Sequence, residues 1–228
     1  MSVVLVTGGA KRIGQAICRD LARDHTVVVH ANRSGAEATE LAKELDGHVV
    51  LGDLSDPAVA QRLIEEVVRV AGRIDHVVNN ASAFPRVGWA DVTYADVDEM
   101  MRLHAWAPLA ITRAAAQAGA SSVVNLLDTR ILDDDPDHVA YHLSKQALWG
   151  LTRSMARGLA PLRVNGVAPG PILEPTDGSG HNLDAGVEAT VLKRAGRPEE
   201  VASAVRFLLG ASYVTGEVVF VDGGRHLN

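Results

Sequence analysis

Short valine-rich runs alternate with helix-length amphipathic segments along this chain of 228 residues. We predict strands over residues 3–6, 26–30, 49–51, 76–78, 123–127, 163–167 and 217–221. Helices are predicted over residues 13–23, 36–45, 57–71, 97–118, 140–158 and 199–209. Because continuous apolar runs are typical of strands buried on both faces, the pattern predicts a parallel sheet covered by helices.

This alternation predicts one α/β domain over residues 1–228, a doubly wound parallel sheet of the Rossmann type with helices on both faces. Two segments interrupt it. Residues 133–137 (DDDPD) are predicted to form a solvated turn ahead of a helix. Residues 169–190 begin with a stretch rich in glycine, proline and polar side chains, and we predict a substrate loop there.

Composition limits the kinds of partner and the compartment. The net charge of −6 disfavours non-specific binding to nucleic acid or to anionic membranes. The single cysteine, Cys18, cannot form a disulfide within the chain, so the sequence fits a reducing compartment. No apolar run has the length of a membrane span, and the histidines form no metal-like spacing with acids. We therefore predict a cytoplasmic protein without a metal that acts on a small molecule.

A glycine-rich stretch, Thr7–Gly14 (TGGAKRIG), lies between the first predicted strand and the first predicted helix. In that position, backbone N–H groups and the helix N-terminus can bind a pyrophosphate. Gly8 and Gly9 permit a sharp turn, and Gly14 lets the helix pack closely on the sheet. The alternative is an ordinary strand–helix turn that contains glycines.

The end of the second predicted strand indicates which dinucleotide would bind. NAD sites place an Asp or Glu there for the ribose 2′-hydroxyl, but residues 30–34 (HANRS) contain no carboxylate. Arg33 and Ser34 can donate to a 2′-phosphate, while Lys11 and Arg12 add positive charge from the glycine-rich loop. We therefore predict NADP(H), with the alternative that Arg33 is a surface residue at a helix start.

Polar or small residues also follow the third and fourth predicted strands, where a dinucleotide would cross the sheet. Asp53 can accept a hydrogen bond from the adenine amino group, or it can cap the following helix. The full set of residues predicted to contact the cofactor is Gly8, Lys11, Arg12, Ile13, His30, Asn32, Arg33, Ser34, Asp53, Leu54, Asn80, Ala81, Ser82, Tyr141, Lys145, Pro169, Gly170 and Ile172.

Tyr141 and Lys145 are four residues apart in a helical pattern and therefore share one helix face. An ammonium near a phenol favours the phenolate, so we expect Lys145 to lower the pKa of Tyr141 and make it an acid–base group. Taken alone, the spacing is common by chance, and a pair of surface residues would be the preferred interpretation.

Together, the glycine-rich loop, the Asn79-Asn80-Ala81 run, Tyr141-x-x-x-Lys145 and Pro169-Gly170 resemble the short-chain dehydrogenases/reductases over essentially the whole chain. The resemblance implies a homotetramer. It also implies that Asp128 stands where the family usually has a carbonyl-binding serine. It further implies that His104 replaces an asparagine that holds a water in the proton relay. Whether His104 holds a water, donates a proton or only packs in a helix is left open.

Within that family, Arg12, the segment Asn80–Phe84 (NASAF) and Asp128 resemble the pteridine and dihydromonapterin reductases. The resemblance implies that Phe84 stacks on a pterin, that Ser82 contacts it, and that Arg12 faces both pterin and phosphate. An ionised carboxylate cannot donate to a ketone oxygen, whereas it suits the N–H groups of a heteroaromatic ring. The alternative is that Asp128 caps the following turn.

The leading hypothesis is NADPH-dependent reduction of a dihydropterin to a tetrahydropterin. Its catalytic residues would be Asp128, Tyr141 and Lys145, and its substrate contacts Arg12, Ser82, Phe84, Asp128 and Tyr141. Two alternatives are NADPH-dependent reduction of a ketone or 3-oxoacyl thioester, and a non-catalytic NADP-binding regulator. Asp128 disfavours the first alternative, and the intact Tyr141–Lys145 pair disfavours the second.

Overall fold

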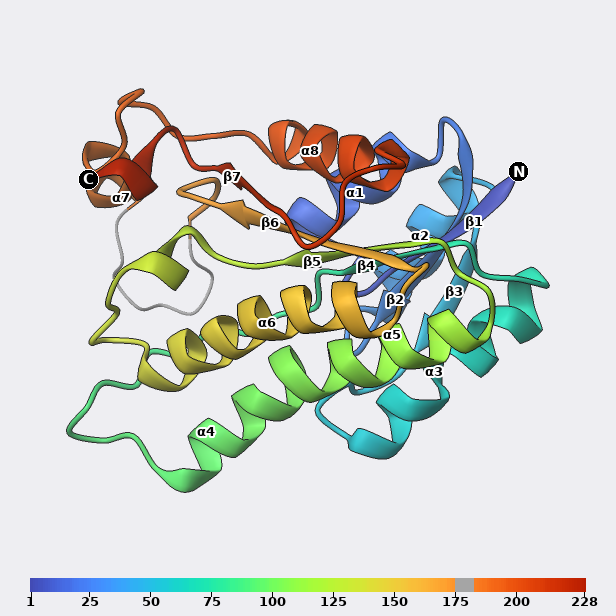
Figure 1. Ribbon diagram of the computed structural model, residues 1–228, viewed down its shortest axis with the longest axis horizontal. Helices are drawn as coiled ribbons and strands as arrows, with labels where there is room; N and C mark the ends of the chain where they lie inside the picture. Colours follow the sequence, from blue (N-terminus) through green and yellow to red (C-terminus); the bar gives the residue numbers. More distant parts are fainter. Residues whose placement is uncertain (175–182) are drawn as a thin grey trace.

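A computed structural model describes residues 1–174 and 183–228 and confirms the predicted α/β fold (Figure 1). The seven strands of its sheet are parallel and lie in the order β3-β2-β1-β4-β5-β6-β7. They are β1 (Ser2–Val6), β2 (His25–Ala31), β3 (His48–Leu51), β4 (His76–Asn79), β5 (Ser122–Leu126), β6 (Arg163–Pro169) and β7 (Val218–Val221). Because the winding reverses between β1 and β4, the ends of these two strands open a crevice where ligands bind in such sheets.

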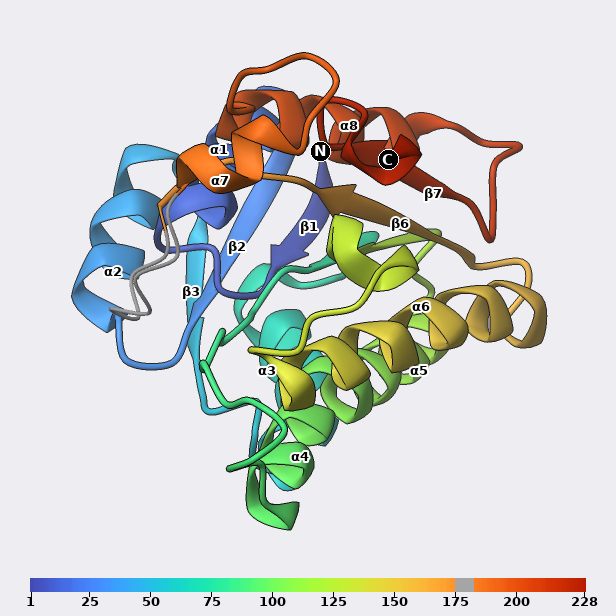
Figure 2. The same cartoon turned by 90° about the vertical axis from the view of Figure 1, so that its left-hand side faces the viewer.

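Helices cover both faces of the sheet (Figures 1 and 2). They are α1 (Arg12–Leu21), α2 (Gly35–Glu44), α3 (Pro57–Ala71), α4 (Tyr94–Met101), α5 (Ala107–Gln117), α6 (Val139–Gly158), α7 (Leu183–Glu188) and α8 (Pro198–Gly210). Helices α1, α2 and α8 share one apolar core with the sheet, and α3, α5 and α6 share the other. The valine-rich strands supply both cores, which explains why polar residues do not alternate along them.

The long helix predicted over residues 97–118 differs from the structure in two ways. It begins earlier, at Tyr94, because Thr93 and Asp96 form a reciprocal capping box. It is also interrupted by a π-helical segment, η1 (Arg102–Trp106), which separates α4 from α5. His104 lies in that segment, and π-helical turns of this kind frequently occur at functional sites.

The prediction of a solvated turn at residues 133–137 is wrong for Asp135. This residue is 8 % exposed, whereas Asp133 and Asp134 are exposed as predicted. The carboxylate of Asp135 accepts hydrogen bonds from Arg130 and His138. Since a buried charge needs partners, these contacts account for its position.

The predicted substrate loop, residues 169–190, includes residues 175–182, which lie outside the described part of the chain. The described part is not irregular throughout, because it contains the short helix α7. Two 3-10 helices, η2 (Thr129–Leu132) and η3 (Arg225–Leu227), contact each other near the same end of the sheet. These segments and the strand ends surround the site described next.

Candidate active site

The glycine-rich loop lies against the end of β4 and has no room for a side chain at Gly8 or Gly14. Gly8 has a left-handed φ of +60°, and a Cβ there would lie 2.9 Å from the Cα of Ala81. A Cβ on Gly14 would lie 2.2 Å from the carbonyl oxygen of Gly8. The Nδ2 of Asn80 donates to the carbonyl oxygens of Thr7 at 2.9 Å and Gly8 at 3.0 Å. The loop is therefore a cradle of the kind that lets backbone approach a pyrophosphate closely.

His30 supports this cradle from inside the protein. It is 1 % exposed, its Nδ1 accepts from the N–H of Gly8 at 3.2 Å, and its Nε2 donates to the carbonyl oxygen of Gly52 at 3.1 Å. Burial lowers the pKa of His30 to about 4, so its imidazole is neutral at pH 7. Its side chain therefore acts on the predicted cofactor site through the loop.

A His30→Gln variant is expected to lose part of the acid sensitivity of the wild-type protein. The folded pKa of about 4 lies below the ordinary 6.5, so between these values the unfolded chain binds a proton that the folded protein does not. Stability is complete above pH 6.5 and falls as the pH drops through that window. From pH 7 to pH 5 the expected loss from His30 is about 2 kcal/mol. Urea unfolding at both pH values checks this, and equal losses in wild type and variant would contradict it.

The residues predicted to hold a 2′-phosphate lie on the rim of the cradle. Lys11 pairs with Glu37 on α2 at 2.7 Å, and both side chains are about half exposed. Arg33 is exposed and Ser34 precedes α2. An exposed pair contributes at most about 1 kcal/mol, so Lys11 can exchange its carboxylate partner for a phosphate at little cost.

Asp53 does not cap α3, so that interpretation is wrong. Its Oδ1 accepts from the N–H and the hydroxyl of Ser55 at 2.9 Å and 2.7 Å. Asp56 is the cap, because it accepts from the N–H of Ala58 at 2.8 Å. The hydrogen bonds from Ser55 lower the pKa of Asp53, which is therefore an anionic acceptor at neutral pH. Its contact with adenine stays a prediction.

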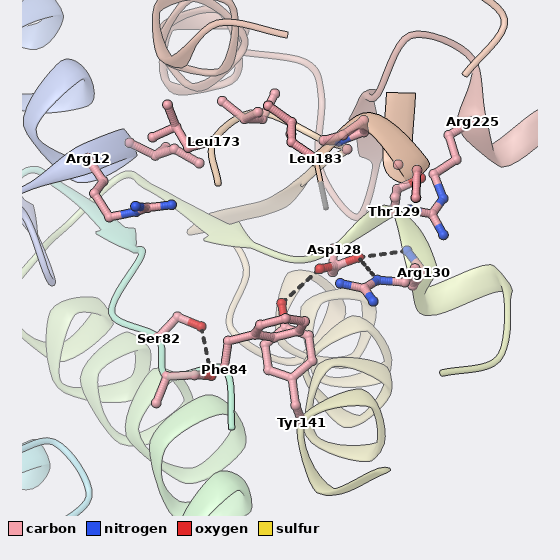
Figure 3. A pocket seen from close by; sticks show the side chains of 17 residues that line it. Arg12, Ser82, Phe84, Asp128, Thr129, Arg130, Tyr141, Leu173, Leu183 and Arg225 are labelled. Atoms are coloured by element: carbon pink, nitrogen blue, oxygen red, sulfur yellow. Dashed lines mark hydrogen bonds and ion pairs between the residues drawn. The ribbon is translucent and has the colours of Figure 1, made fainter. Parts of the chain in front are cut away.

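The ends of β5 and α6 bring two predicted catalytic residues together (Figure 3). The Oδ2 of Asp128 accepts a hydrogen bond from the hydroxyl of Tyr141 at 2.8 Å. The Oδ1 of Asp128 accepts from the N–H of Arg130 at 2.9 Å and so caps η2. The alternative that Asp128 caps the following turn is therefore confirmed, while its second oxygen holds the phenol of Tyr141. Its contact with the N–H groups of a substrate ring stays a prediction.

Tyr141 is expected to be a protonated phenol at neutral pH. Burial, followed by the carboxylate of Asp128, raises the pKa of Tyr141 well above its ordinary value. The expected lowering by Lys145 is wrong here, because the Nζ of Lys145 donates to the carbonyl oxygen of Leu126 at 2.8 Å and lies 5.6 Å from the centre of the Tyr141 ring. Tyr141 is therefore arranged to donate a proton rather than to accept one.

Lys145 lies beneath this pair and is 3 % exposed. Burial lowers its pKa to about 8, and the charge of Asp128 partly opposes that shift. At pH 7 the side chain is thus still mainly an ammonium. It places a positive charge on the protein side of the Asp128–Tyr141 pair.

His104 is a packed residue with both ring nitrogens occupied. Its Nε2 lies 3.0 Å from the hydroxyl of Ser82 and accepts from the N–H of Ala83 at 3.3 Å. Its Nδ1 donates to the hydroxyl of Ser144 at 2.8 Å, and that hydroxyl donates to the backbone carbonyl of Tyr141 at 2.6 Å. Burial lowers the pKa of His104 well below its ordinary value. The neutral ring joins the Ser82 loop to α6, and neither nitrogen is left to hold a relay water.

A charged cluster on η2 and the segment after it was not predicted from the sequence. Arg130 donates to the Oδ1 of Asp128 at 3.4 Å and also to Asp135, while the Nδ1 of His138 lies 3.0 Å from Asp135. The cluster holds a guanidinium against the carboxylate oxygen that does not face Tyr141. The only signal in the sequence was an arginine next to a run of aspartates, which is common on protein surfaces.

Phe84 lines the pocket, but one face of its ring is already covered. The ring stacks on that of His138, with centroids 3.9 Å apart and planes 16° apart. It also meets the Tyr141 ring edge to face, with centroids 4.6 Å apart. The guanidinium carbon of Arg130 also lies over this ring, 5.0 Å from its centroid. The stacking of Phe84 on a substrate ring stays a prediction.

These residues meet in a pocket of about 540 Å³ at the carboxyl ends of the central strands (Figure 3). All five predicted substrate contacts line it, and three of these, Arg12, Ser82 and Tyr141, are also predicted cofactor contacts. Three further predicted cofactor residues, Ile13, Gly170 and Ile172, line it too. The remaining described residues that line it are Ala83, Thr129, Arg130, Pro171, Leu173, Leu183, Ala185, Gly186 and Arg225. Over residues 1–174 and 183–228, no group of three or more His, Cys, Asp or Glu side chains is arranged for a metal ion, and no helix is long and apolar enough to cross a membrane.

Comparison with known proteins adds to this geometry. A family profile described as "Enoyl-(Acyl carrier protein) reductase" matches residues 8–226. The chain is 32 % identical over 278 residues to pteridine reductase 1 of Leishmania tarentolae, covering 99 % of this chain and 96 % of that protein. It is 36 % identical over 239 residues to "Granaticin polyketide synthase putative ketoacyl reductase 2" of Streptomyces violaceoruber, with coverage of 99 % and 96 %.

A solved structure shares the whole fold. The crystal structure of FolM alternative dihydrofolate reductase 1 from Brucella canis, complexed with NADP, is 35 % identical in sequence and superposes with a TM-score of 0.90. The match covers 100 % of this chain and 95 % of that one. By name, the relatives therefore include both pterin-type and ketoacyl-type reductases.

Proposed function

Because the chain belongs to the short-chain dehydrogenase/reductase family of oxidoreductases, we propose that it reduces an oxidised pterin with NADPH. The observation that carries this proposal is the hydrogen bond of 2.8 Å between the Tyr141 hydroxyl and the Asp128 carboxylate. A carboxylate accepts hydrogen bonds, and the nitrogen-bearing edge of a pterin donates them, whereas a ketone oxygen requires a donor. The names of the pteridine reductase and FolM relatives agree with this assignment.

The cradle at the end of β1 fits a dinucleotide, since Cβ atoms at Gly8 and Gly14 would fill it. The loop up to Ile13 would hold the pyrophosphate, and Arg33 with Ser34 would hold the 2′-phosphate. NADPH supplies a hydride when bound. The described residues after β6, Gly170 and Ile172, would seat the reactive end of the cofactor next to Tyr141, because all three line the same pocket.

The residues of the chain would then supply the proton. Tyr141 keeps its hydroxyl hydrogen at neutral pH, because burial and Asp128 raise its pKa. It would pass that proton to the ring nitrogen beside the carbon that is reduced. The positive charges of Arg130 and Lys145 near Asp128 favour the negative charge that remains on the pair after the transfer.

An assay of NADPH consumption tests the proposal. Purified protein is incubated with NADPH and either 7,8-dihydrobiopterin or dihydromonapterin, and the NADPH absorbance is followed. We expect consumption with a dihydropterin and its loss in a Tyr141→Phe variant. If the protein binds NADPH but no pterin oxidises it, pterin reduction is rejected.

Reduction of a ketone or 3-oxoacyl thioester is the second candidate, because the relative named as a ketoacyl reductase is as similar as the pterin reductases. It requires Tyr141 to turn its hydroxyl from Asp128 to a carbonyl oxygen. A panel of both substrate classes in the same assay separates the two activities. A regulator without activity would bind NADPH and turn over neither class.

A homotetramer, which the family resemblance implies, is also part of this proposal. An apolar surface groove along η1, bordered by the ends of α3 and α4 and by α5 and α6, supports association through this face. It is lined by Pro57, Met101, Arg102, Ala105, Trp106, Leu109 and Leu151. The assembly and the cytoplasmic location both stay predictions.

A further inference from the structure

Three arginines line the pocket, and they differ in their partners. Arg12 donates to a backbone carbonyl oxygen at 2.6 Å, and Arg130 is held by Asp128 and Asp135. The guanidinium of Arg225 makes no hydrogen bond or ion pair with any residue in the described part of the chain. An arginine that lines a pocket without such a partner can bind an oxyanion through its planar set of donors.

Hydrogen bonds to the neighbouring backbone hold Arg225 in position, so its side chain is not needed to keep it there. The carboxylate of Asp222, which is 4 % exposed, accepts from the N–H groups of Gly224 and His226 at 2.9 Å each. It also accepts from the hydroxyl of Thr129 at 2.6 Å, which ties this loop to η2. The residues on both sides of Arg225 are thus fixed by one buried carboxylate, and its guanidinium is left for a ligand.

Arg225 lies at the end of the pocket away from the glycine-rich loop. In Figure 3, Arg12 and Arg225 are on opposite sides, and Asp128 and Tyr141 lie between them. Because Arg12 belongs to the loop that would hold the pyrophosphate, the cofactor would occupy the Arg12 end. A substrate ring bonded to Asp128 would then direct a long substituent toward the Arg225 end.

We propose that Arg225 binds a carboxylate on the substituent of the substrate. The enzyme would accordingly prefer a pterin with a carboxylate-bearing tail to one with a neutral polyol tail. This inference rests on the proposed pterin reduction and adds the class of substituent to it. Hydrogen bonds to charged groups contribute more to binding than hydrogen bonds between neutral groups. Loss of Arg225 should therefore weaken binding of the anionic substrate more than binding of the neutral one.

The test compares 7,8-dihydrofolate with 7,8-dihydrobiopterin, which share the reducible ring but differ in the charge of the tail. Arg225→Gln is expected to lower kcat/KM for dihydrofolate about tenfold or more, chiefly through KM. For dihydrobiopterin the expected change is less than about twofold, since no charge–charge contact is lost. Arg225→Lys should retain part of the preference. Arg62→Gln, which removes an exposed cation on α3, is the matched control and should alter neither value.

The outcomes separate this inference from the proposed function. Equal losses with both substrates, or no loss, in a folded Arg225→Gln enzyme would overturn the role of Arg225 and leave pterin reduction standing. Failure of the wild-type enzyme to reduce either pterin, although it binds NADPH, would overturn both. If the variant does not fold, the salt dependence of KM in the wild-type enzyme tests the inference instead. Higher ionic strength should raise KM for dihydrofolate more than for dihydrobiopterin, and equal effects would overturn the inference.

Discussion

Asp128→Asn should lower kcat for pterin reduction by about 100-fold or more. Asparagine keeps the size of the side chain but removes the negative charge, and its amide N–H groups would oppose the N–H groups of the substrate ring. It would also weaken the contact of 2.8 Å that holds the Tyr141 hydroxyl in place. NADPH affinity should change little, because Asp128 follows β5 and does not belong to the glycine-rich loop or to the other predicted cofactor contacts. Steady-state rates at saturating NADPH measure the effect.

Asp134→Asn is the matched control, because Asp134 is an exposed acid in the same part of the chain. It should keep the wild-type kcat. Asp128→Ser supplies the hydroxyl that the wider family uses, and a gain of ketone reduction with a loss of pterin reduction would support the assignment. An Asp128→Asn enzyme that retains most of its pterin-reducing activity would show that the carboxylate is not required.

Gly14→Ala should raise the dissociation constant for NADPH by about 100-fold or more, since shifts near 1 Å in a binding site have effects of this size. The new Cβ would lie 2.2 Å from the carbonyl oxygen of Gly8 and 2.7 Å from the Nδ2 of Asn80. Both atoms belong to the cradle, so the loop must move away from the place where the pyrophosphate would bind. Fluorescence titration with NADPH measures the change.

Gly150→Ala serves as the control for this substitution. Gly150 lies in α6, and a Cβ there would have no neighbour within 4 Å. Alanine should therefore stabilise the helix by about 0.5–1 kcal/mol and leave NADPH affinity unchanged. If Gly14→Ala bound NADPH as tightly as the wild type, the loop would be able to relax, and its tight geometry would not be needed for binding.

The parts of the site that depend on short-range patterns could be predicted from the sequence. Tyr141 and Lys145 share a helix face because four residues make about one turn. Gly8 and Gly14 belong to the turn between β1 and α1, where backbone geometry alone demands glycine. Asp128 could be placed at the end of a strand and recognised as a possible cap, but its hydrogen bond with the Tyr141 hydroxyl was not predicted.

Residues that meet across long stretches of chain were beyond such reasoning. Arg225 lies at the pocket next to a loop that Asp222 ties to Thr129, which belongs to a segment far earlier in the sequence. His104 contacts both Ser82 and Ser144 from a π-helical turn, and no local sequence pattern predicted that turn. Neither contact leaves a periodicity or a spacing that could be recognised.

Hydrophobic periodicity and glycine positions, which act over a few neighbouring residues, were enough to predict the parallel sheet, most of its helices and the tight turn after β1. They did not predict the π-helical break before α5 or the short helix α7. Protonation and partner choice were decided only by tertiary structure. The ammonium of Lys145 was expected to lower the pKa of Tyr141, yet burial and the contact with Asp128 raise it. The reason is physical: a pKa depends on the solvent that folding removes and on the charges that folding brings near, and neither is a property of local sequence.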